Sequence, residues 1–269
     1  MDEYLLREDA PLSKADWDRI DNTVVEVAKR LLVGRRFIHL MGVLGYGTQF
    51  VTVDRLDKSA DVVAVDPSKR KIVPMTPIQK DFKLLAQDLV TGEQTGLKFD
   101  TGPAVLAAVK AAQEEDEIIF RGSAAIEGLL TVKGQSTAPM GNWNEPNSGI
   151  TAVAGAVGTL MGAGYLGPFT LVTNPVTYTK LLRPVHGQGA QLELKLVEQI
   201  ATGGIFQSPV LKENEAIVIS TGQENLDLAI GQDLVTAYLG PEGMDHTFRL
   251  LETIALRIKR PGAICILKG

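Results

Sequence analysis

Cysteine and histidine are scarce in this sequence. It contains one cysteine and three histidines among its 269 residues. A single cysteine excludes an internal disulfide framework and a zinc site of the CxxC type. His39, His186 and His246 are far apart in the sequence, so they form no local metal-binding motif. We therefore expect no metal site, and we expect Cys265, in the apolar run 263–267, to be a small buried core residue.

The common catalytic motifs are also missing. The sequence has no Walker loop, no HExxH and no GxSxG. Residues 162–167, "GAGYLG", match the dinucleotide fingerprint GxGxxG, but that motif works only after a strand and before a helix. Here an expected helix precedes it and an expected strand follows, so glycines that end a helix explain the match. A Ser/His/Asp triad is recognised by geometry rather than by sequence position, and nothing singles out a serine here. We predict no catalytic residue and no enzyme activity.

The sequence lacks an excess of basic residues. It has 27 Lys and Arg against 32 Asp and Glu, which gives a formal net charge of -5. The densest basic cluster, 68–71, is too short to follow a phosphate backbone, so we expect no nucleic-acid partner. The first ten residues are acidic where a secretory signal peptide needs a basic region, and we therefore expect a cytoplasmic protein.

One long apolar run, 149–169, approaches the length of a membrane span. It is rich in glycine and alanine, however, and it has neither a basic flank nor an aromatic belt. These properties favour a closely packed helix buried in the protein, and we expect no membrane partner.

Helical patterns recur along the chain. Ser13 has the properties of an N-cap, and apolar residues follow it at helical spacing as far as Gly34, a helix stop. A second helix is predicted over 101–117, with Pro103 in its first turn. The glycine- and alanine-rich run described above supplies a third.

Extended patterns lie between and after these helices. The segment from about 48 to 78 contains three prolines, which favour a long exposed hairpin or edge strands. A hairpin or strand is predicted at 126–134, a loop at 134–149, and mostly strands beyond 204. Because helices and strands are mixed without a regular βαβ series, the expected fold class is α+β.

Four consecutive acidic residues occupy positions 114–117, at the end of the second predicted helix. Successive helical residues point about 100° apart, so the four do not converge on one metal ion. Their charge is unfavourable at a helix C-terminus and calls for basic partners, such as Arg121 or residues of a neighbouring chain. A metal or catalytic role remains the alternative to an ion-pair network within or between subunits.

Several segments together resemble the encapsulins, the linocin-type bacteriocin family. They are the stretch from "LLREDAPLS" to "RRFIHL", "EEDEIIFRGSAAIEGLL", "LGPFTLVTNPVTY", "GGIFQSPVL" and "LAIGQDLVTAY". They follow the family's order from Leu5 to the C-terminus. The resemblance implies the tailed-phage major capsid protein fold of the Hong Kong 97 type, with a peripheral domain, an axial domain and an extended loop. The implied boundaries are 1–47 for the N-terminal helix and first strands of the peripheral domain, 48–78 for the extended loop, 79–133 for the peripheral domain with its spine helix, 134–225 for the axial domain and 226–269 for C-terminal strands of the peripheral domain.

The resemblance also implies a function. Encapsulins are shell proteins, so copies of this chain should assemble into an icosahedral nanocompartment of sixty subunits or a multiple of sixty. Such a shell would enclose a cargo enzyme, a ferritin-like iron storage protein or a dye-decolourising peroxidase, through a C-terminal peptide of the cargo that docks on the inner wall. The implied cargo-binding residues, for which a plain core role is the alternative, are Val24, Ala28, Leu31, Leu32, Arg35, His39, Ile230, Asp233, Leu234 and Tyr238.

Two further features follow from the same resemblance. The loop 183–191 corresponds to the family's five-fold pore loop and contains His186, Gly187, Gln188 and Gly189; an ordinary surface loop is the alternative. Some encapsulins stack a flavin on a tryptophan, but no aromatic residue follows Phe82 in the corresponding stretch, so we expect no cofactor.

Two rival functions are considered. A bacteriocin or protease of the linocin type would need a nucleophile and base that the sequence does not show. A phage-derived capsid protein would be expected to carry an N-terminal extension or to package DNA, whereas this chain starts close to its first helix.

Overall fold

The first helix, α1 (Lys14–Leu31), begins where the sequence predicts. Ser13 and Asp16 form a capping box, in which the Ser13 side chain accepts from the Asp16 N–H and the Asp16 carboxylate accepts from the Ser13 N–H. The buried stripe of the helix follows the 3.6-residue period through Trp17, Ile20 and Val24. The fold is described here from a computed structural model that covers residues 1–269 except 1–2, 55–64, 66–67, 69, 97 and 186–190.

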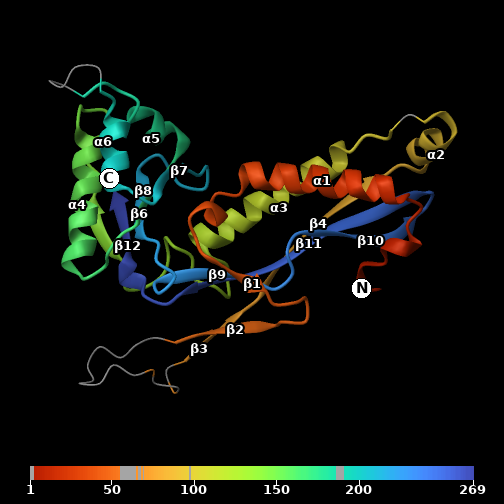
Figure 1. The fold of residues 1–269 in the computed structure, drawn as a ribbon, viewed down its shortest axis with the longest axis horizontal. Helices are drawn as coiled ribbons and strands as arrows, with labels where there is room; N and C mark the ends of the chain where they lie inside the picture. Colours follow the sequence, from red (N-terminus) through yellow and green to blue (C-terminus); the bar gives the residue numbers. More distant parts are fainter. Residues whose placement is uncertain (1–2, 55–64, 66–67, 69, 97, 186–190) are drawn as a thin grey trace.

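The second long helix, α3 (Gly102–Arg121), lies beside α1 along the length of the molecule (Figure 1). It extends four residues beyond the predicted end, so the acidic run 114–117 precedes the last turn rather than forming it. Gly34 is needed where the two helices meet, because a Cβ there would lie 2.5 Å from Ile119 Cδ1. Gly34 therefore ends the α1 segment as predicted, three residues after the last helical residue, and opens the 3₁₀ turn η3 (Gly34–Arg36).

The end of α3 explains a wrong prediction. No strand forms at 126–134; instead this segment folds back, and the N–H groups of Leu129 and Leu130 donate to the carbonyls of Ile119 and Phe120. The segment thus satisfies carbonyl groups that the helix end leaves open. Gly122, with φ of 82°, makes the reversal, and a Cβ there would lie 2.3 Å from the Ile126 carbonyl oxygen.

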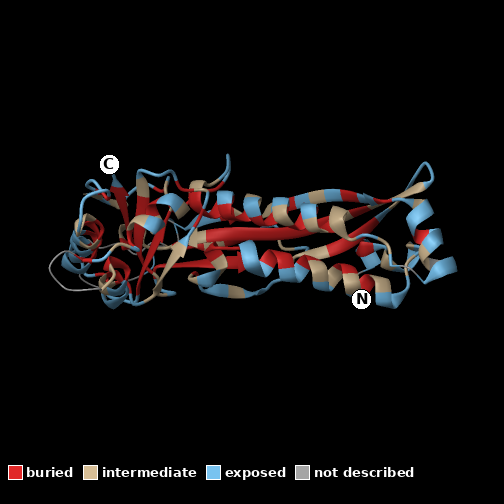
Figure 2. Cartoon of the chain, turned by 90° about the horizontal axis from the view of Figure 1, so that it is seen from above, coloured by how far each residue is buried: buried red, intermediate tan, exposed pale blue. Residues whose placement is uncertain are grey.

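A five-stranded sheet lies beneath α1 and α3. Its order is β1 (Leu40–Val43), β9 (Leu226–Ile230), β11 (Asp245–Ile258) and β10 (Val235–Glu242), and β4 (Thr76–Leu84) also pairs with β11. The 14-residue β11 runs antiparallel to β10, β4 and β9 in turn. Figure 2 shows these strands as buried bands between the helices.

A two-stranded hairpin of β2 (Phe50–Val53) and β3 (Lys71–Pro74) projects from the middle of the molecule (Figure 1). It confirms the predicted hairpin for the residues that the structure describes. Two prolines are tolerated because of where they lie. Pro74 ends β3, and Pro77 lies in β4, which among the described strands pairs only with β11. Pro67 lies outside the described residues.

A second lobe lies at the other end of the molecule. Its sheet has the order β5 (Ser136–Pro139), β12 (Ile264–Lys268), β8 (Glu215–Ser220), β6 (Phe169–Thr173) and β7 (Gly204–Gln207), and its helices are α4 (Ser148–Gly162), α5 (Pro175–Lys180) and α6 (Glu193–Ile200). The segment 226–269 therefore divides between the two sheets, because β12 pairs with β5 and β8. Cys265 on β12 is fully buried, as predicted.

The glycine-rich motif at 162–167 begins at the last residue of α4 and ends before β6, which is the order the sequence predicts and the opposite of a dinucleotide site. Among the described residues, none of the helices has the length and hydropathy that a membrane span requires.

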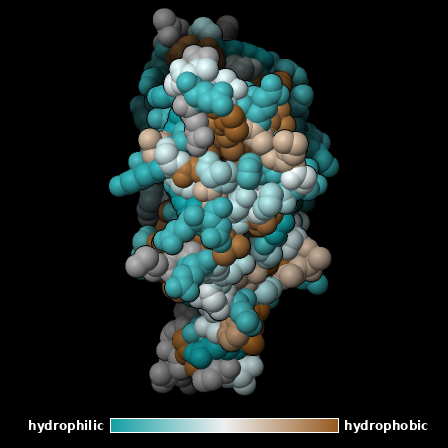
Figure 3. Space-filling view, turned by 90° about the vertical axis from the view of Figure 1, so that its right-hand side faces the viewer, coloured by the Kyte–Doolittle hydropathy of each residue, from teal (hydrophilic) through white to brown (hydrophobic). Residues whose placement is uncertain are grey.

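The far end of the first lobe carries a short helix, α2 (Ala86–Thr95), which directly follows β4. Figure 3 shows this end of the molecule, where hydrophilic side chains predominate and apolar ones form small patches.

Candidate functional site

The four acidic residues of the run 114–117 point in different directions, as helical geometry requires. Their partners are Lys80 for Glu114, Arg35 for Glu115, the backbone N–H groups of Val33 and Gly34 for Asp116, and Arg121 for Glu117. Within the described residues, no group of three or more His, Cys, Asp or Glu side chains is arranged to hold a metal ion. The ion-pair interpretation is confirmed for Glu114, Glu115 and Glu117, which form ion pairs within the chain, with Arg121 as one of the partners.

Arg35 is the centre of this network. Its Nε lies 2.8 Å from Glu115 Oε1, its Nη1 lies 2.8 Å from Asp233 Oδ1, and its Nη2 contacts both Glu115 and Glu252. Glu115 and Glu252 are 0% and 2% exposed. The guanidinium thus ties η3 to α3, β11 and the turn between β9 and β10, which are far apart in the sequence.

Burial raises the pKa of two of the acidic residues, Glu115 and Asp116. Removal from water raises the pKa of Glu115 to about 7, against the opposing effect of Arg35. Burial also raises the pKa of Asp116 to about 6, although the N–H groups of Gly34 and Val33 stabilise its ionised form.

An apolar groove lies directly beside Arg35. Its volume is about 340 Å³. It is formed by the C-terminal half of α1, by η3, by the start of β1 and by the turn before β10. Its lining residues are Val25, Ala28, Lys29, Leu32, Arg35, Arg36, Leu40, Asp233 and Leu234.

Half of the predicted cargo-binding residues line this groove, namely Ala28, Leu32, Arg35, Asp233 and Leu234. Val25, Lys29, Arg36 and Leu40 also line the groove and were not among the predicted residues. Val25, Ala28, Lys29 and Leu32 form a helical stripe with the spacing i, i+3, i+4, i+7. This stripe shares Ala28 and Leu32 with the predicted residues but has Val25 and Lys29 where the prediction had Val24 and Leu31. Periodicity alone does not distinguish the two stripes, because both contain apolar residues.

The other predicted residues lie elsewhere. Val24, Ile230 and Tyr238 are 2%, 3% and 5% exposed and belong to the hydrophobic core. The core alternative is therefore correct for these three. The Tyr238 hydroxyl lies 2.8 Å from His246 Nδ1, so its polar end already has a partner. Leu31 and His39 are exposed but do not line the groove. The predicted pore residues, His186 to Gly189, lie outside the described residues.

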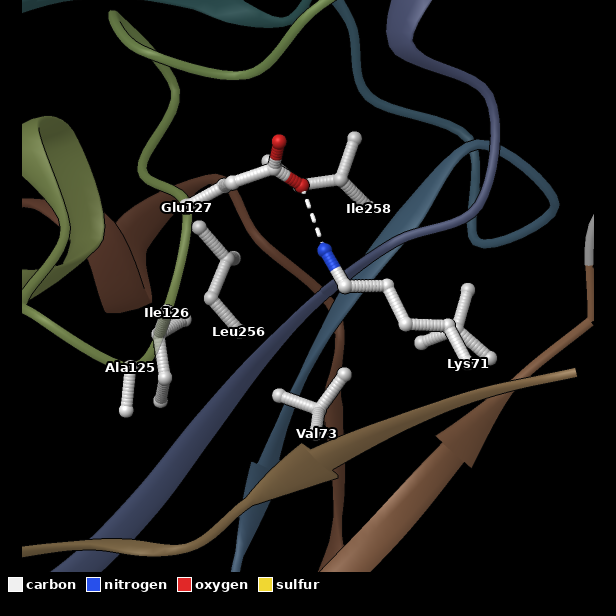
Figure 4. A pocket seen from close by; sticks show the side chains of 8 residues that line it. Lys71, Val73, Ala125, Ile126, Glu127, Leu256 and Ile258 are labelled. Carbon is white, nitrogen blue, oxygen red and sulfur yellow. Dashed lines mark hydrogen bonds and ion pairs between the residues drawn. The ribbon is translucent and has the colours of Figure 1, made fainter.

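A much smaller cavity, of about 20 Å³, lies where the β2–β3 hairpin joins the body (Figure 4). Val73 of β3 and Leu256 and Ile258 of β11 form its apolar wall. The Lys71 ammonium and the Glu127 carboxylate point toward each other at its rim, 2.6 Å apart. The volume is that of about one water molecule, so this is a packing joint and no ligand site.

Comparison with known proteins shows which family this fold belongs to. The family model described as an encapsulating protein for peroxidase matches residues 1–255. The type 1 encapsulin shell protein EncA of Myxococcus xanthus is 38% identical, over 100% of this chain and 98% of its own length. This chain belongs to the encapsulin family.

Other encapsulins and capsid proteins show the same relationship. A diheme-cytochrome–encapsulin shell fusion protein of Kuenenia stuttgartiensis is 36% identical over 96% of this chain and 74% of its own length. A ferritin-like–encapsulin shell fusion protein of Pyrococcus furiosus is 28% identical over 87% of this chain and 64% of its own length.

Solved structures agree. The virus-like particle from Pyrococcus furiosus has a TM-score of 0.82 and 25% identity, covering 94% of this chain and 99% of that one. The capsid of the Myoviridae phage XM1 has a TM-score of 0.69 and 14% identity, covering 89% and 92%. The phage capsid fold implied by the sequence resemblance is thus confirmed.

Proposed function

We propose that this chain is the subunit of a closed protein shell that encloses a cargo enzyme, and that the groove beside Arg35 binds a C-terminal peptide of that cargo. The observation that carries the second part is the groove itself, which this chain presents between α1 and the β9–β10 turn. Apolar groups of Val25, Leu32 and Leu234 line it, and Lys29, Arg36 and Asp233 supply charged groups. Apolar walls with a few orienting polar groups are typical of sites that take up an extended segment.

The parts of the subunit have corresponding proposed roles. The first lobe is the peripheral domain, the hairpin is the extended loop that contacts a neighbouring subunit, and the second lobe is the axial domain near the symmetry axes. Four exposed apolar side chains on or beside the hairpin support a contact there: Val43, Tyr46, Phe50 and Ile72 are 67%, 44%, 55% and 62% exposed. Burial of such side chains between subunits favours assembly.

The pore, the cellular location and the absence of a cofactor and of nucleic acid stay predictions. His186, Gly187, Gln188 and Gly189 are proposed to line a pore, and the shell is expected to lie in the cytoplasm with no flavin and no bound nucleic acid. The fusion of related shell domains to a ferritin-like domain and to a diheme cytochrome supports redox or iron-handling cargo.

Cargo loading tests the groove. The probe is a fluorescent reporter that carries the C-terminal tail of an enzyme encoded beside this gene, coexpressed with the shell protein. We expect Val25→Asp to reduce the reporter recovered per shell by at least about tenfold, because a buried carboxylate in an apolar groove costs several kcal/mol. Reporter fluorescence per assembled particle is the measurement.

The matched control is Leu31→Asp. Leu31 lies on the same helix and is 38% exposed, against 39% for Val25, but it does not line the groove. Equal loss of loading in both variants, or none in either, would contradict the groove as the peptide site.

A further inference from the structure

Three carboxylates share the Arg35 guanidinium. Two of them, Glu115 and Glu252, are buried and meet at the same nitrogen, Nη2. The third, Asp233, binds Nη1, and its side chain is 56% exposed. Among the described residues, Arg35 is the only cation that pairs with Glu115 or Glu252. One positive charge therefore faces three negative ones.

The charged groups around this cluster do not restore the balance. Asp116, the next residue on α3, raises the pKa of Glu115, and its own charge is met by two backbone N–H groups and by the nearby Arg36. On β4, Lys80 is paired with Glu114. The excess negative charge thus stays on the pair of Glu115 and Glu252.

A pair of buried carboxylates at one cation retains a proton more strongly than either would alone. Burial raises the pKa of Glu115 to about 7, which places the loss of this proton near neutral pH. Glu252 contacts the same nitrogen as Glu115, so the two carboxylates compete for one cation.

Of the three carboxylates, Asp233 is the one that is able to dissociate from Arg35. Water solvates its exposed side chain, whereas leaving Arg35 would strand Glu115 or Glu252 in the interior. Asp233 Oδ1 also accepts from the Leu234 N–H at 2.9 Å, so its position fixes the Leu234 wall of the groove.

We propose that a proton held by the Glu115–Glu252 pair keeps Asp233 on Arg35 and the Leu234 wall in place, and that loss of this proton releases Asp233 and loosens the groove. With both buried carboxylates ionised, their repulsion competes with the binding of Asp233 to the shared guanidinium. That the groove is a peptide site rests on the proposed function; the proton-dependent wall does not.

The direction of the pH dependence follows from linkage. Glu115 has a higher pKa in the folded protein than its ordinary value of 4.5. Its contribution to stability is therefore complete below the ordinary value and is lost as the pH rises through about 7. The Leu234 wall of the groove is expected to be ordered in mildly acidic solution, with Asp233 bound to Arg35, and more mobile in mildly alkaline solution.

Hydrogen–deuterium exchange of the empty assembled shell tests the inference. The measured quantity is the protection of the Leu234 amide, corrected for the intrinsic effect of pH on exchange. We expect protection to fall about tenfold between about pH 6 and about pH 8.5, the change that corresponds to a coupling of one pKa unit. Unchanged protection across this range would overturn the inference.

Substitutions test whether Glu115 and Glu252 cause the pH dependence of the Leu234 amide. Glu115→Gln keeps a hydrogen-bonding group but removes the titrating charge, so protection should stay high at both pH values. Glu114→Gln, one residue away and paired with Lys80, should behave like the natural protein. If Glu115→Gln does not assemble, Glu252→Gln makes the same test. A variant profile identical to that of the natural protein would contradict the role of the pair.

The exchange measurement also separates the two proposals, because it needs no peptide. Reporter loading is measured at the same two pH values, and the inference predicts more loading at the lower one. A pH-dependent Leu234 amide with no loading at either pH would refute the peptide groove while supporting the proton-dependent wall.

Discussion

At the scale of single residues, the turn after α3 shows most clearly why one side chain decides local structure. Gly122 has φ of 82°, and backbone atoms of Ile126 and Gly128 lie 2.3 Å and 2.7 Å from the place of a Cβ. Any other residue would combine left-handed strain with a backbone clash. The turn therefore depends on glycine, and the Leu129 and Leu130 hydrogen bonds that complete α3 depend on the turn.

We expect Gly122→Ala to lower the free energy of unfolding by about 3 kcal/mol, from strain and overpacking together. The measurement is the midpoint of thermal unfolding at one fixed subunit concentration. Gly155→Ala is the matched control: Gly155 is exposed on α4, nothing lies within 4 Å of its Cβ position, and alanine should raise stability by about 0.5–1 kcal/mol. Equal effects of the two substitutions would contradict this role for Gly122.

The residue scale is also where sequence reasoning was least complete. Helical geometry correctly separated the carboxylates of 114–117 and indicated basic partners. It could not identify Arg35 as the partner of Glu115, because 80 residues separate them and only the fold brings them together. Nor could it identify the role of Asp116, whose partners are backbone N–H groups that leave no sequence signal.

At the scale of elements, the sequence predicted those helices and turns that are determined by residues close together in the chain. The capping box at Ser13 and the apolar stripe located α1, and the proline-containing segment located the hairpin. The face of α1 that the groove uses was only partly predicted, because core and groove both contain apolar residues and periodicity does not distinguish them. The strand predicted at 126–134 failed since contacts with the end of α3 outweigh its β-propensity.

Two interactions attach the β2–β3 hairpin to the body: an ion pair and the packing of apolar side chains. The Lys71–Glu127 ion pair is partly exposed, with side chains 43% and 33% accessible, so its removal should cost less than about 1 kcal/mol. Val73 is 6% exposed and packs against β11 around the small cavity, so Val73→Ala should cost about 2 kcal/mol.

Denaturant unfolding of Val73→Ala and Lys71→Ala, at the same subunit concentration, ranks the two contributions. We expect the midpoint to fall clearly further for Val73→Ala. A larger fall for Lys71→Ala would show that the ion pair, rather than apolar packing, holds the hairpin to the body.

At the scale of the whole molecule, the subunit has the properties of a part of a larger assembly. It is elongated, its hairpin projects away from the body, and apolar side chains on and beside that hairpin are exposed (Figure 1). Composition and periodicity indicated only an α+β protein without catalytic motifs. The resemblance of several ordered segments identified the capsid fold, because the pairing of strands distant in sequence, as between β1 and β9, leaves no local pattern.

The mass of the purified particle tests the central proposal of a closed shell most directly. Single-particle mass measurement should give one narrow population at about 1.7 MDa, sixty times the subunit mass of 28.9 kDa, or at a whole multiple of that value. Negative-stain images of the same sample should show hollow particles of uniform diameter. A monomer or a small oligomer at micromolar concentration would contradict the shell and every role assigned to its interior.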